Sequence, residues 1–229
     1  MNIRIAKTVF RQEYIPLQIG FIVIRDMNNH KSTPESLHLL HEAEHLIQLT
    51  FNKDNVKSHA LIAPWTVAQM EFGEKAQHYH TSVEQLLRHV VAKKKLASKD
   101  TLTNIVRYLS LRHIIPLGVD DLDKIKGNIV FDLAKRRQRV RLFRSLKPNE
   151  LYYHDRKSIL GTKLDYWKNS RTRVTPQSHS ALLHCEALPP LTSAKLRSVL
   201  QESAQLIEQF TGARTKIFIL SKRKPSARF

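Results

Sequence analysis

Apolar residues recur at helical spacing in several segments of the chain, and capping signals bound those segments. Thr33 and Pro34 open the first predicted helix, whose apolar stripe runs to about Phe51. Thr192 opens the last, which ends at Gly212. The predicted helices between them cover Pro64–Glu71, the stretch from the capping box Thr81-Ser82-Val83-Glu84 to Lys93-Lys94-Lys95, and Asp100–Arg112.

Other segments have the short β-branched or alternating pattern of strands. The predicted strands are Asn2–Ala6, Leu17–Arg25, Asn128–Leu133, Val140–Phe143, Leu151–Tyr153, Ile159–Tyr166, Ala181–Ala187 and Lys216–Leu220. No internal repeat and no linker interrupts these elements. We therefore expect one mixed α+β domain over residues 1–220, followed by a basic, flexible tail over residues 221–229.

The stretch just before the third of these strands, Asn128–Leu133, carries an unusual group of carboxylates. Pro116 ends the preceding helix, and Gly118 predicts a tight turn after it. Asp120, Asp121 and Asp123 follow directly, in a chain that is otherwise strongly basic. This turn is a candidate pocket floor, with a plain connection between helix and strand as the alternative.

Composition limits the classes of protein that need consideration. With 229 residues and 41% hydrophobic content, the chain can build a real core. Its single cysteine, Cys185, excludes an intramolecular disulfide and suits a reducing compartment. The first residues lack the apolar core of a secretion signal, and no apolar run approaches the roughly 20 residues of a membrane span. We expect a cytoplasmic protein without a membrane partner.

The net charge is +18, and the positive charge is concentrated. Lys124–Arg173 holds 15 Lys and Arg residues against 4 Asp and Glu residues. Such a density of positive charge is typical of proteins that bind along the phosphate backbone of a nucleic acid, so RNA is the expected partner. The alternative is a generally basic, well-solvated surface.

The densest part of this segment predicts an RNA-contacting strand. If Arg139 and Arg141 alternate along a strand, they share one face and position phosphates without reading sequence. A solvated hairpin is the alternative. The expected RNA-binding residues are Lys135, Arg136, Arg137, Arg139, Arg141, Arg144, Lys168, Arg171 and Arg173. For Arg171, a bidentate phosphate clamp and a structural salt bridge remain equal alternatives.

One helical motif formally fits a zinc site. His41 and His45 are four residues apart with Glu42 after the first, as in the zinc-protease pattern His-Glu-x-x-His. A third ligand is needed nearby, and the segment otherwise reads as an ordinary amphipathic helix. A metal hydrolase is therefore the least favoured hypothesis, and no metal or cofactor is expected.

The order of several motifs resembles a known family. The motifs are Phe72-Gly73, Tyr79, Ser82-Val83-Glu84-x-Leu86-Leu87-Arg88, Ser110-Leu111-Arg112-His113-x-x-Pro116, Gly118, Asp121-Leu122-Asp123-Lys124-Ile125-x-Gly127, Asn169-Ser170-Arg171-Thr172-x-Val174-Thr175 and Ala187-Leu188-Pro189-Pro190. Together they resemble the tRNA-binding and editing module, the B3/B4 domain, of the phenylalanyl-tRNA synthetase beta chain. The resemblance covers about residues 15–220 and is closer still to freestanding proteins made of that module.

This resemblance implies a mixed α/β sandwich-like domain that binds tRNA or aminoacyl-tRNA. In the synthetase the module hydrolyses wrongly attached tyrosine from tRNA without a metal. The implied function is a tRNA-binding protein that acts in trans as an aminoacyl-tRNA deacylase. The alternative is a tRNA- or RNA-binding module that kept the fold and lost the hydrolysis. No obligate protein partner is evident.

The chain departs from the synthetase at pocket positions. Gly118 stands where the synthetase has a histidine, and Lys168-Asn169-Ser170-Arg171 replaces a Gly-Gly-Glu. Asn104 and Arg107 replace an Asp and an Asn that are common in freestanding members. The expected substrate pocket is Asn104, Gly118, Asp120, Asp121, Asn169, Ser170 and Thr172. The candidate catalytic residues are Asp121, Asn169 and Thr172, where Asp120 or Asp121 would hold the substrate α-ammonium.

Overall fold

The structure is a computed structural model that describes most of the 229 residues. The described ranges are 1–10, 16–29, 32–70, 81–96, 100–135, 138–141, 144–146, 148–162 and 167–229. Within them, only the backbone is described for residues 68–70, 138–141, 144 and 145.

Four of the described helices begin at capping residues, and the sequence indicated three of these, Thr33, Thr81 and Thr192. Thr33, Thr81, Asp100 and Thr192 each accept a hydrogen bond from a backbone N–H of the first turn. The helices are α1 (Pro34–Thr50), α2 (Ala63–Met70), α3 (Ser82–Val91), α4 (Thr101–His113) and α5 (Ser193–Thr211), with short 3-10 turns η1 (Lys7–Phe10), η4 (Leu122–Lys124) and η5 (Ser170–Thr172).

The described strands form two main sheets and a hairpin. They are β1 (Asn2–Ile5), β2 (Gln18–Arg25), β3 (Leu117–Asp121), β4 (Ile129–Leu133), β5 (Gln138–Arg141), β6 (Arg144–Leu146), β7 (Leu151–His154), β8 (Ile159–Thr162), β9 (Trp167–Lys168), β10 (Ala181–Ala187), β11 (Arg214–Leu220) and β12 (Ser226–Arg228). The inner sheet has the order β11-β2-β10-β3, and the outer sheet has the order β12-β1-β4-β7-β8-β9. Strands β5 and β6 pair only with each other among the described strands.

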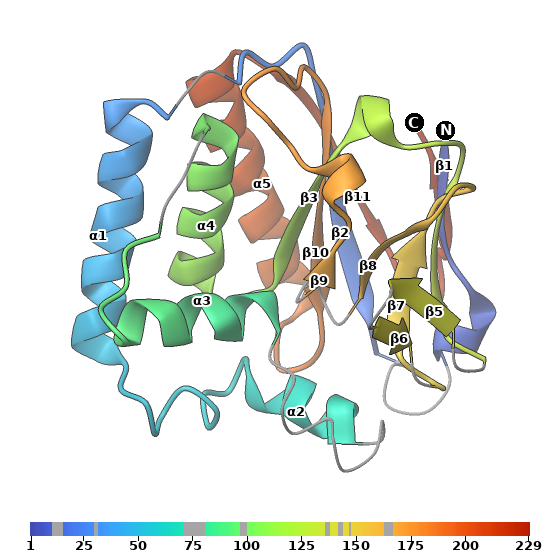
Figure 1. Ribbon diagram of the computed structural model, residues 1–229, viewed down its shortest axis with the longest axis horizontal. Helices are drawn as coiled ribbons and strands as arrows, with labels where there is room; N and C mark the ends of the chain where they lie inside the picture. The colour runs from blue at the N-terminus through green and yellow to red at the C-terminus, as the bar shows by residue number, and fades with distance from the viewer. Residues whose placement is uncertain are drawn as a thin grey trace.

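These elements stack in layers, with the inner sheet in the middle (Figure 1). Helices α3, α4 and α5 contact the inner sheet on one face, and α1 packs against α4. The outer sheet covers the opposite face (Figure 1). The predicted α+β class is therefore confirmed.

Strand alternation explains how one inner sheet serves two cores. On β2, Ile22 and Ile24 belong to the core under the helices, while Phe21 and Val23 belong to the core between the sheets. A strand buried on both faces reads as a continuous apolar run, which is the pattern of Gln18–Arg25.

The predicted turn at Gly118 is wrong. The chain reverses earlier, at Ile114, which caps α4 in the left-handed conformation with a φ of 53°. Leu117 and Val119 then pack on the core under the helices, so this segment gains more as a strand than as a turn. Gly118, Asp120 and Asp121 consequently lie in β3, and Asp123 lies in η4.

The end of the chain differs from the expected frayed tail. Ser226–Arg228 forms β12, which pairs antiparallel with β1. The reason is an available edge: β1 offers unpaired backbone groups there, and Phe229 stacks on Phe218 with 5.9 Å between ring centroids.

No helix in the described ranges is long and apolar enough to span a membrane.

Candidate active site at the edge of the two sheets

A charged cluster lies between the two sheets, inside an otherwise apolar core. Asp120 is only 1% exposed, and alternation along β3 directs it toward the outer sheet. Its Oδ2 accepts a hydrogen bond from the Tyr153 hydroxyl at 2.8 Å, and its Oδ1 accepts one from Thr172 Oγ1 at 2.5 Å. The Lys168 ammonium lies 3.2 Å from Oδ2. The carboxylate is thus held in place by strands and turns from both sheets.

A histidine from the neighbouring strand completes this group. His184 on β10 is paired in register with Gly118, and directly opposed residues of an antiparallel pair share a face. Its Nδ1 lies 2.7 Å from Glu186 Oε1. Since an ionised carboxylate only accepts hydrogen bonds, Nδ1 carries a proton and donates a hydrogen bond to Glu186. The opposite ring nitrogen, Nε2, lies 3.8 Å from Asp120 Oδ2.

We call these residues the Asp120 cluster: Asp120, Tyr153, Lys168, Thr172, His184 and Glu186. Burying two carboxylates costs free energy unless cations and hydrogen-bond donors surround them. For Asp120, Lys168 is the cation, and the Tyr153 and Thr172 hydroxyls are the hydrogen-bond donors. For Glu186, the donor is the His184 imidazole. The Lys168 side chain is 24% exposed, whereas the Asp120 side chain is 1% exposed, so the lysine forms the solvent side of their ion pair.

The cluster lies where both sheets end. Among the described strands, β3 pairs only with β10 and β9 pairs only with β8, so Asp120 and Lys168 join two edge strands. Alternate N–H groups of an edge strand point away from its partner. The backbone of β3 therefore presents hydrogen-bond donors beside a buried carboxylate, an arrangement that suits the binding of a polar substrate.

Aromatic rings enclose the histidine. The His184 ring centroid lies 4.8 Å from that of Tyr153, 5.7 Å from that of Phe131 and 6.5 Å from that of Phe21. Tyr153 and Phe131 also stack on each other at 4.9 Å. This packing restricts the imidazole to one orientation, which fixes the position of Nε2 toward Asp120.

The residues of the pocket expected from the sequence lie in separate parts of the structure. Gly118, Asp120 and Thr172 lie together, as expected. Asn104 lies on α4 in the helical layer, where its amide donates to Ser32 and Ser36 at 2.8 and 2.9 Å. The inner sheet therefore separates Asn104 from Asp120.

Asp121 faces the opposite side of β3 from Asp120 and serves as a cap. Its Oδ1 accepts a hydrogen bond from the Asp123 N–H at 3.1 Å, at the start of η4. Its Oδ2 accepts one from Ser178 Oγ at 2.5 Å and lies 2.7 Å from Lys124 Nζ. These local contacts explain Asp121 as a turn-stabilising residue.

Asn169 and Ser170 border the cluster through η5. Asn169 caps this turn by accepting from the Arg171 N–H at 3.0 Å, and its own amide donates to the Ile159 carbonyl at 2.9 Å. Ser170 is exposed. Together they hold Thr172, at the end of η5, against Asp120.

Arg171 takes part in a salt bridge within the fold. Its Nη2 lies 2.6 Å from Asp155 Oδ2, and its guanidinium also donates to the Lys124 carbonyl and to Ser158 Oγ. Burial raises the pKa of Asp155, but hydrogen bonds from Arg171 and from the N–H groups of Lys126, Ser158 and Lys157 outweigh it and leave that pKa below its ordinary value. The two alternatives for Arg171 were a phosphate clamp and a structural salt bridge, and these contacts match the salt bridge.

The other expected RNA-binding residues differ in how far they are described. Lys135 and Arg173 are exposed. Arg139, Arg141 and Arg144 lie on the hairpin of β5 and β6, where a register irregularity falls between Arg139 and Arg141. Only the backbone of Arg139 and Arg141 is described, so their predicted shared face stays a prediction; Arg136 and Arg137 lie outside the described residues.

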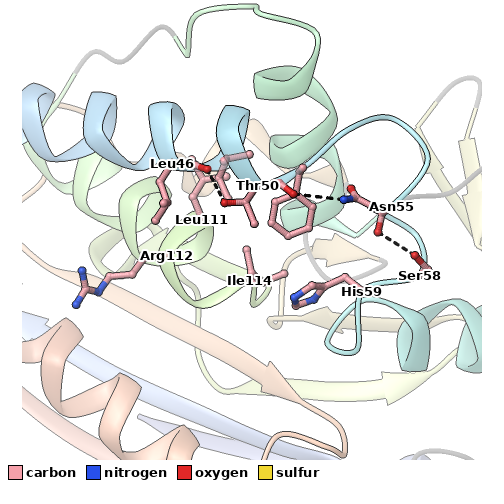
Figure 2. A pocket seen from close by; sticks show the side chains of 10 residues that line it. Leu46, Thr50, Asn55, Ser58, His59, Leu111, Arg112 and Ile114 are labelled. Carbon is pink, nitrogen blue, oxygen red and sulfur yellow. Dashed lines mark hydrogen bonds between the residues drawn. The ribbon is translucent and has the colours of Figure 1, made fainter.

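A separate hollow of about 450 Å³ lies in the helical layer, between the ends of α1 and α4 and the loop after α1 (Figure 2). Its lining is mainly apolar. Three of its polar side chains bond to nearby backbone: Thr50 donates to the Leu46 carbonyl, Asn55 to that of Thr50 and Ser58 to that of Asn55. Burial lowers the pKa of His59, which also lines it. None of the expected site residues lines this hollow, and it lacks a carboxylate.

The described ranges contain no group of three or more His, Cys, Asp and Glu residues placed to hold a metal ion. His41 and His45 are exposed on α1, and Glu42 between them pairs instead with His38 at 3.2 Å.

Sequence reasoning missed Tyr153, His184 and Glu186 as members of the site. One signal was present: His184 and Glu186 are two residues apart in a strand that is otherwise apolar, so they share a buried face. Buried ionisable residues on one strand face require partners, and this requirement could have indicated the cluster.

A family model described as the B3/4 domain matches residues 64–212. Among solved structures, the chain is similar to an N-terminal fragment of the phenylalanyl-tRNA synthetase beta-subunit from Pyrococcus horikoshii, with 15% identity and a TM-score of 0.39. This likeness covers 52% of the chain and 43% of the fragment, so the chain spans less than half of the fragment's length. Comparison with curated proteins found no match.

Proposed function

The chain belongs to the B3/4 domain family, and from this premise we propose that it binds tRNA and hydrolyses the ester of a wrongly attached amino acid. The observation that carries the proposal is the Lys168–Asp120 ion pair, a buried carboxylate at a sheet edge in a chain of net charge +18. An RNA-binding module without hydrolysis is the second candidate, and the missing synthetase-type pocket residues at Gly118 and Lys168–Arg171 favour it.

Aminoacyl-tRNA combines two features that this chain matches. The nucleic acid is a polyanion, which the cationic surface attracts without reading sequence. The aminoacyl group carries a free α-ammonium beside the ester, and a buried carboxylate is the natural partner of an ammonium. Few other substrates require both groups in one molecule.

Lys168 occupies the place on Asp120 that the substrate would take. Its ammonium lies 3.2 Å from Asp120 Oδ2 on the solvent side of the cluster. In the proposed complex the substrate α-ammonium replaces it, and Lys168 turns toward the phosphates. Tyr153 and Thr172 keep the carboxylate in position during this exchange, because each donates a hydrogen bond to it.

The reaction requires little beyond binding and orientation, since the aminoacyl ester is already activated. Water attacks the ester carbonyl carbon, the carbon–oxygen bond to the ribose breaks, the water oxygen stays on the released amino acid, and the ribose oxygen takes up a proton that the water gives up. N–H groups on the open edge of β3 stabilise the negative charge that develops on the carbonyl oxygen. His184, held by Glu186, acts as a positioning residue behind Asp120.

The hairpin of β5 and β6 connects the RNA surface to the cluster. Leu146 of the hairpin packs with Tyr152 of β7, and the next residue, Tyr153, points into the cluster from the other face of that strand. RNA bound along the hairpin would therefore lie over the strand that contributes to the site, on the opposite face of the outer sheet.

The test is a panel of correctly and wrongly charged tRNAs incubated with the wild-type protein, with tRNA affinity measured in parallel. The proposal predicts micromolar or tighter binding and accelerated release of at least one amino acid. Binding without any release would establish the non-catalytic alternative. Absence of tRNA binding at moderate salt would contradict both candidates.

A further inference from the structure

The two ends of the chain build a second basic surface, away from the Asp120 cluster. We call it the terminal strip, and it consists of exposed cations on β1, on β12 and on the turn between β11 and β12. Its members are Arg4, Lys222, Arg223, Lys224 and Arg228.

The terminal strip is held by a paired backbone. In the register of β12 on β1, Arg228 opposes Asn2 and Ser226 opposes Arg4. Ile3 points into the core between the sheets and Ala227 packs against that core, so the alternate residues Arg4 and Arg228 point outward together. Two backbone hydrogen bonds between Ser221 and Lys224, of 3.0 and 3.1 Å, close the turn.

The extreme termini are also anchored. The α-ammonium of Met1 donates to the Phe229 carbonyl at 3.0 Å, and the Phe229 N–H donates to the Met1 carbonyl at 3.1 Å. The cations of the strip are therefore preorganised, and less conformational entropy is lost when they bind an anion.

Positive charge in these segments is not neutralised by neighbouring sequence. Residues 1–10 and 213–229 contain 8 Lys and Arg residues and no Asp or Glu. Among the described residues, the salt bridge that involves these segments joins Arg214 to Asp26 at the start of β11. Clustered cations without carboxylates repel one another, and a polyanion relieves that repulsion.

Arg4 and Arg228 of the strip lie on the same face of the outer sheet as the β5–β6 hairpin. Tyr152, which contacts the hairpin, opposes Asp132 on β4, while Arg4 on β1 pairs in register with Val130 on β4. Only β4 separates β1 from β7 in the strand order, a gap of roughly 10 Å at the usual strand spacing. Cations at both sides of this face can thus contact one continuous phosphate backbone.

We propose that the terminal strip is a second phosphate-contact surface for the same structured RNA, which it holds across the outer sheet. This inference rests on the proposed function, since the RNA is the tRNA assigned there. The strip adds affinity and orientation and reads no sequence. The alternative is that these charged residues only prevent the edge strand from pairing with another chain, and this role would require no contact with RNA.

The experiment compares two fourfold Lys/Arg→Gln variants that remove equal charge. The strip variant carries Lys222→Gln, Arg223→Gln, Lys224→Gln and Arg228→Gln. The control carries Lys57→Gln, Lys93→Gln, Lys94→Gln and Lys95→Gln, all exposed residues of the helical side. The dissociation constant of fluorescent tRNA is measured for each between 50 and 200 mM salt, and circular dichroism verifies the fold.

We expect the strip variant to weaken tRNA binding at least about 10-fold and to reduce the slope of log affinity against log salt by about 2 to 3, while the control changes affinity less than about 2-fold. Equal effects of the two variants, or an unchanged strip variant, would overturn the inference and leave the proposed function intact. A wild-type protein that does not bind tRNA overturns both. Loss of binding to anionic vesicles without loss of tRNA binding would assign the strip to membranes and overturn it as well.

Discussion

The Tyr153 hydroxyl donates a hydrogen bond of 2.8 Å to the Asp120 carboxylate, and this contact joins the outer sheet to the inner sheet. It lies in a core that otherwise consists of residues such as Phe21 and Phe131. Apolar residues of similar volume often stabilise a core at least as well as buried charges. The proposed function accounts for this buried carboxylate as a group that binds the substrate.

The contribution of this hydrogen bond can be measured with Tyr153→Phe. The variant keeps the ring that stacks on Phe131 and removes only the hydroxyl. Because Asp120 loses a donor while it stays buried, we expect a loss of about 1–3 kcal/mol in the free energy of unfolding, measured with urea. Tyr152→Phe, on the opposite face of the same strand, is the control. Equal losses in the two variants would contradict the assignment.

The Arg171–Asp155 pair predicts a defined acid sensitivity. A carboxyl whose pKa is lower in the folded protein than in the unfolded chain adds stability above its ordinary value of 3.8, and this contribution is lost as the pH falls through the lowered pKa. Arg171→Gln removes one of the hydrogen bonds that lower the pKa. We expect the variant to be less stable at pH 7 and to begin acid unfolding at higher pH.

Urea midpoints measured from pH 7 to pH 2 test this expectation, with Arg173→Gln as the exposed control. If the two variants share one acid profile, Arg171 does not control the titration of Asp155.

Gly20 allows a close approach between β2 and α5. A Cβ atom at this position would lie 2.5 Å from Leu200 Cδ1, and Leu200 is fully buried. Overpacking of this kind costs about 1–3 kcal/mol, so Gly20→Ala should lower the free energy of unfolding by that amount. In a double-mutant cycle with Leu200→Ala, the paired loss should be at least about 0.5 kcal/mol smaller than the sum of the single losses. If the two losses in the free energy of unfolding are strictly additive, the Cβ atom at position 20 is accommodated by movements that do not involve Leu200.

The helices could be predicted from the sequence because their signals are local. Thr33, Thr81 and Thr192 cap the helices that they were expected to cap, and Gly212 ends α5 in the left-handed conformation with a φ of 63°. Each signal depends on residues within a few positions. The structure therefore confirms these helix starts and the last helix end.

Strand pairing could not be predicted in the same way, because it depends on residues far apart in the chain. Gly118 reads as a turn locally and becomes part of β3 through pairing with β10, more than sixty residues later. β12 formed for the same reason, since its partner β1 lies at the other end of the chain. Neither pairing leaves a local signal.

Part of the pocket expected from the sequence does come together in the structure. Asp120 and Thr172 were both expected pocket residues, and they share a hydrogen bond. The positions of Asn104 and Asp121, by contrast, depend on which side of the inner sheet each residue faces. When a strand is predicted one residue away from its true register, its side chains are assigned to the wrong face of the sheet. The turn predicted at Gly118 led to this error for Asp121.

The central claim is that Asp120 binds the α-ammonium of an aminoacyl-tRNA while its ester is hydrolysed, and single-turnover release of the amino acid tests it most directly. The substrates are the best-released member of the charged tRNA panel and the same tRNA with its amino group acetylated. The proteins are wild type, Asp120→Asn and the control Asp123→Asn, whose residue is exposed in η4.

We predict that wild type and Asp123→Asn release the free aminoacyl group at least about 10-fold faster than the acetylated one, because one charge-assisted contact is worth about 1.5–3 kcal/mol. Asp120→Asn should lose this preference and hydrolyse both substrates at the slow rate. A wild-type protein that releases both substrates equally, or an Asp120→Asn variant that keeps the preference, would contradict the account.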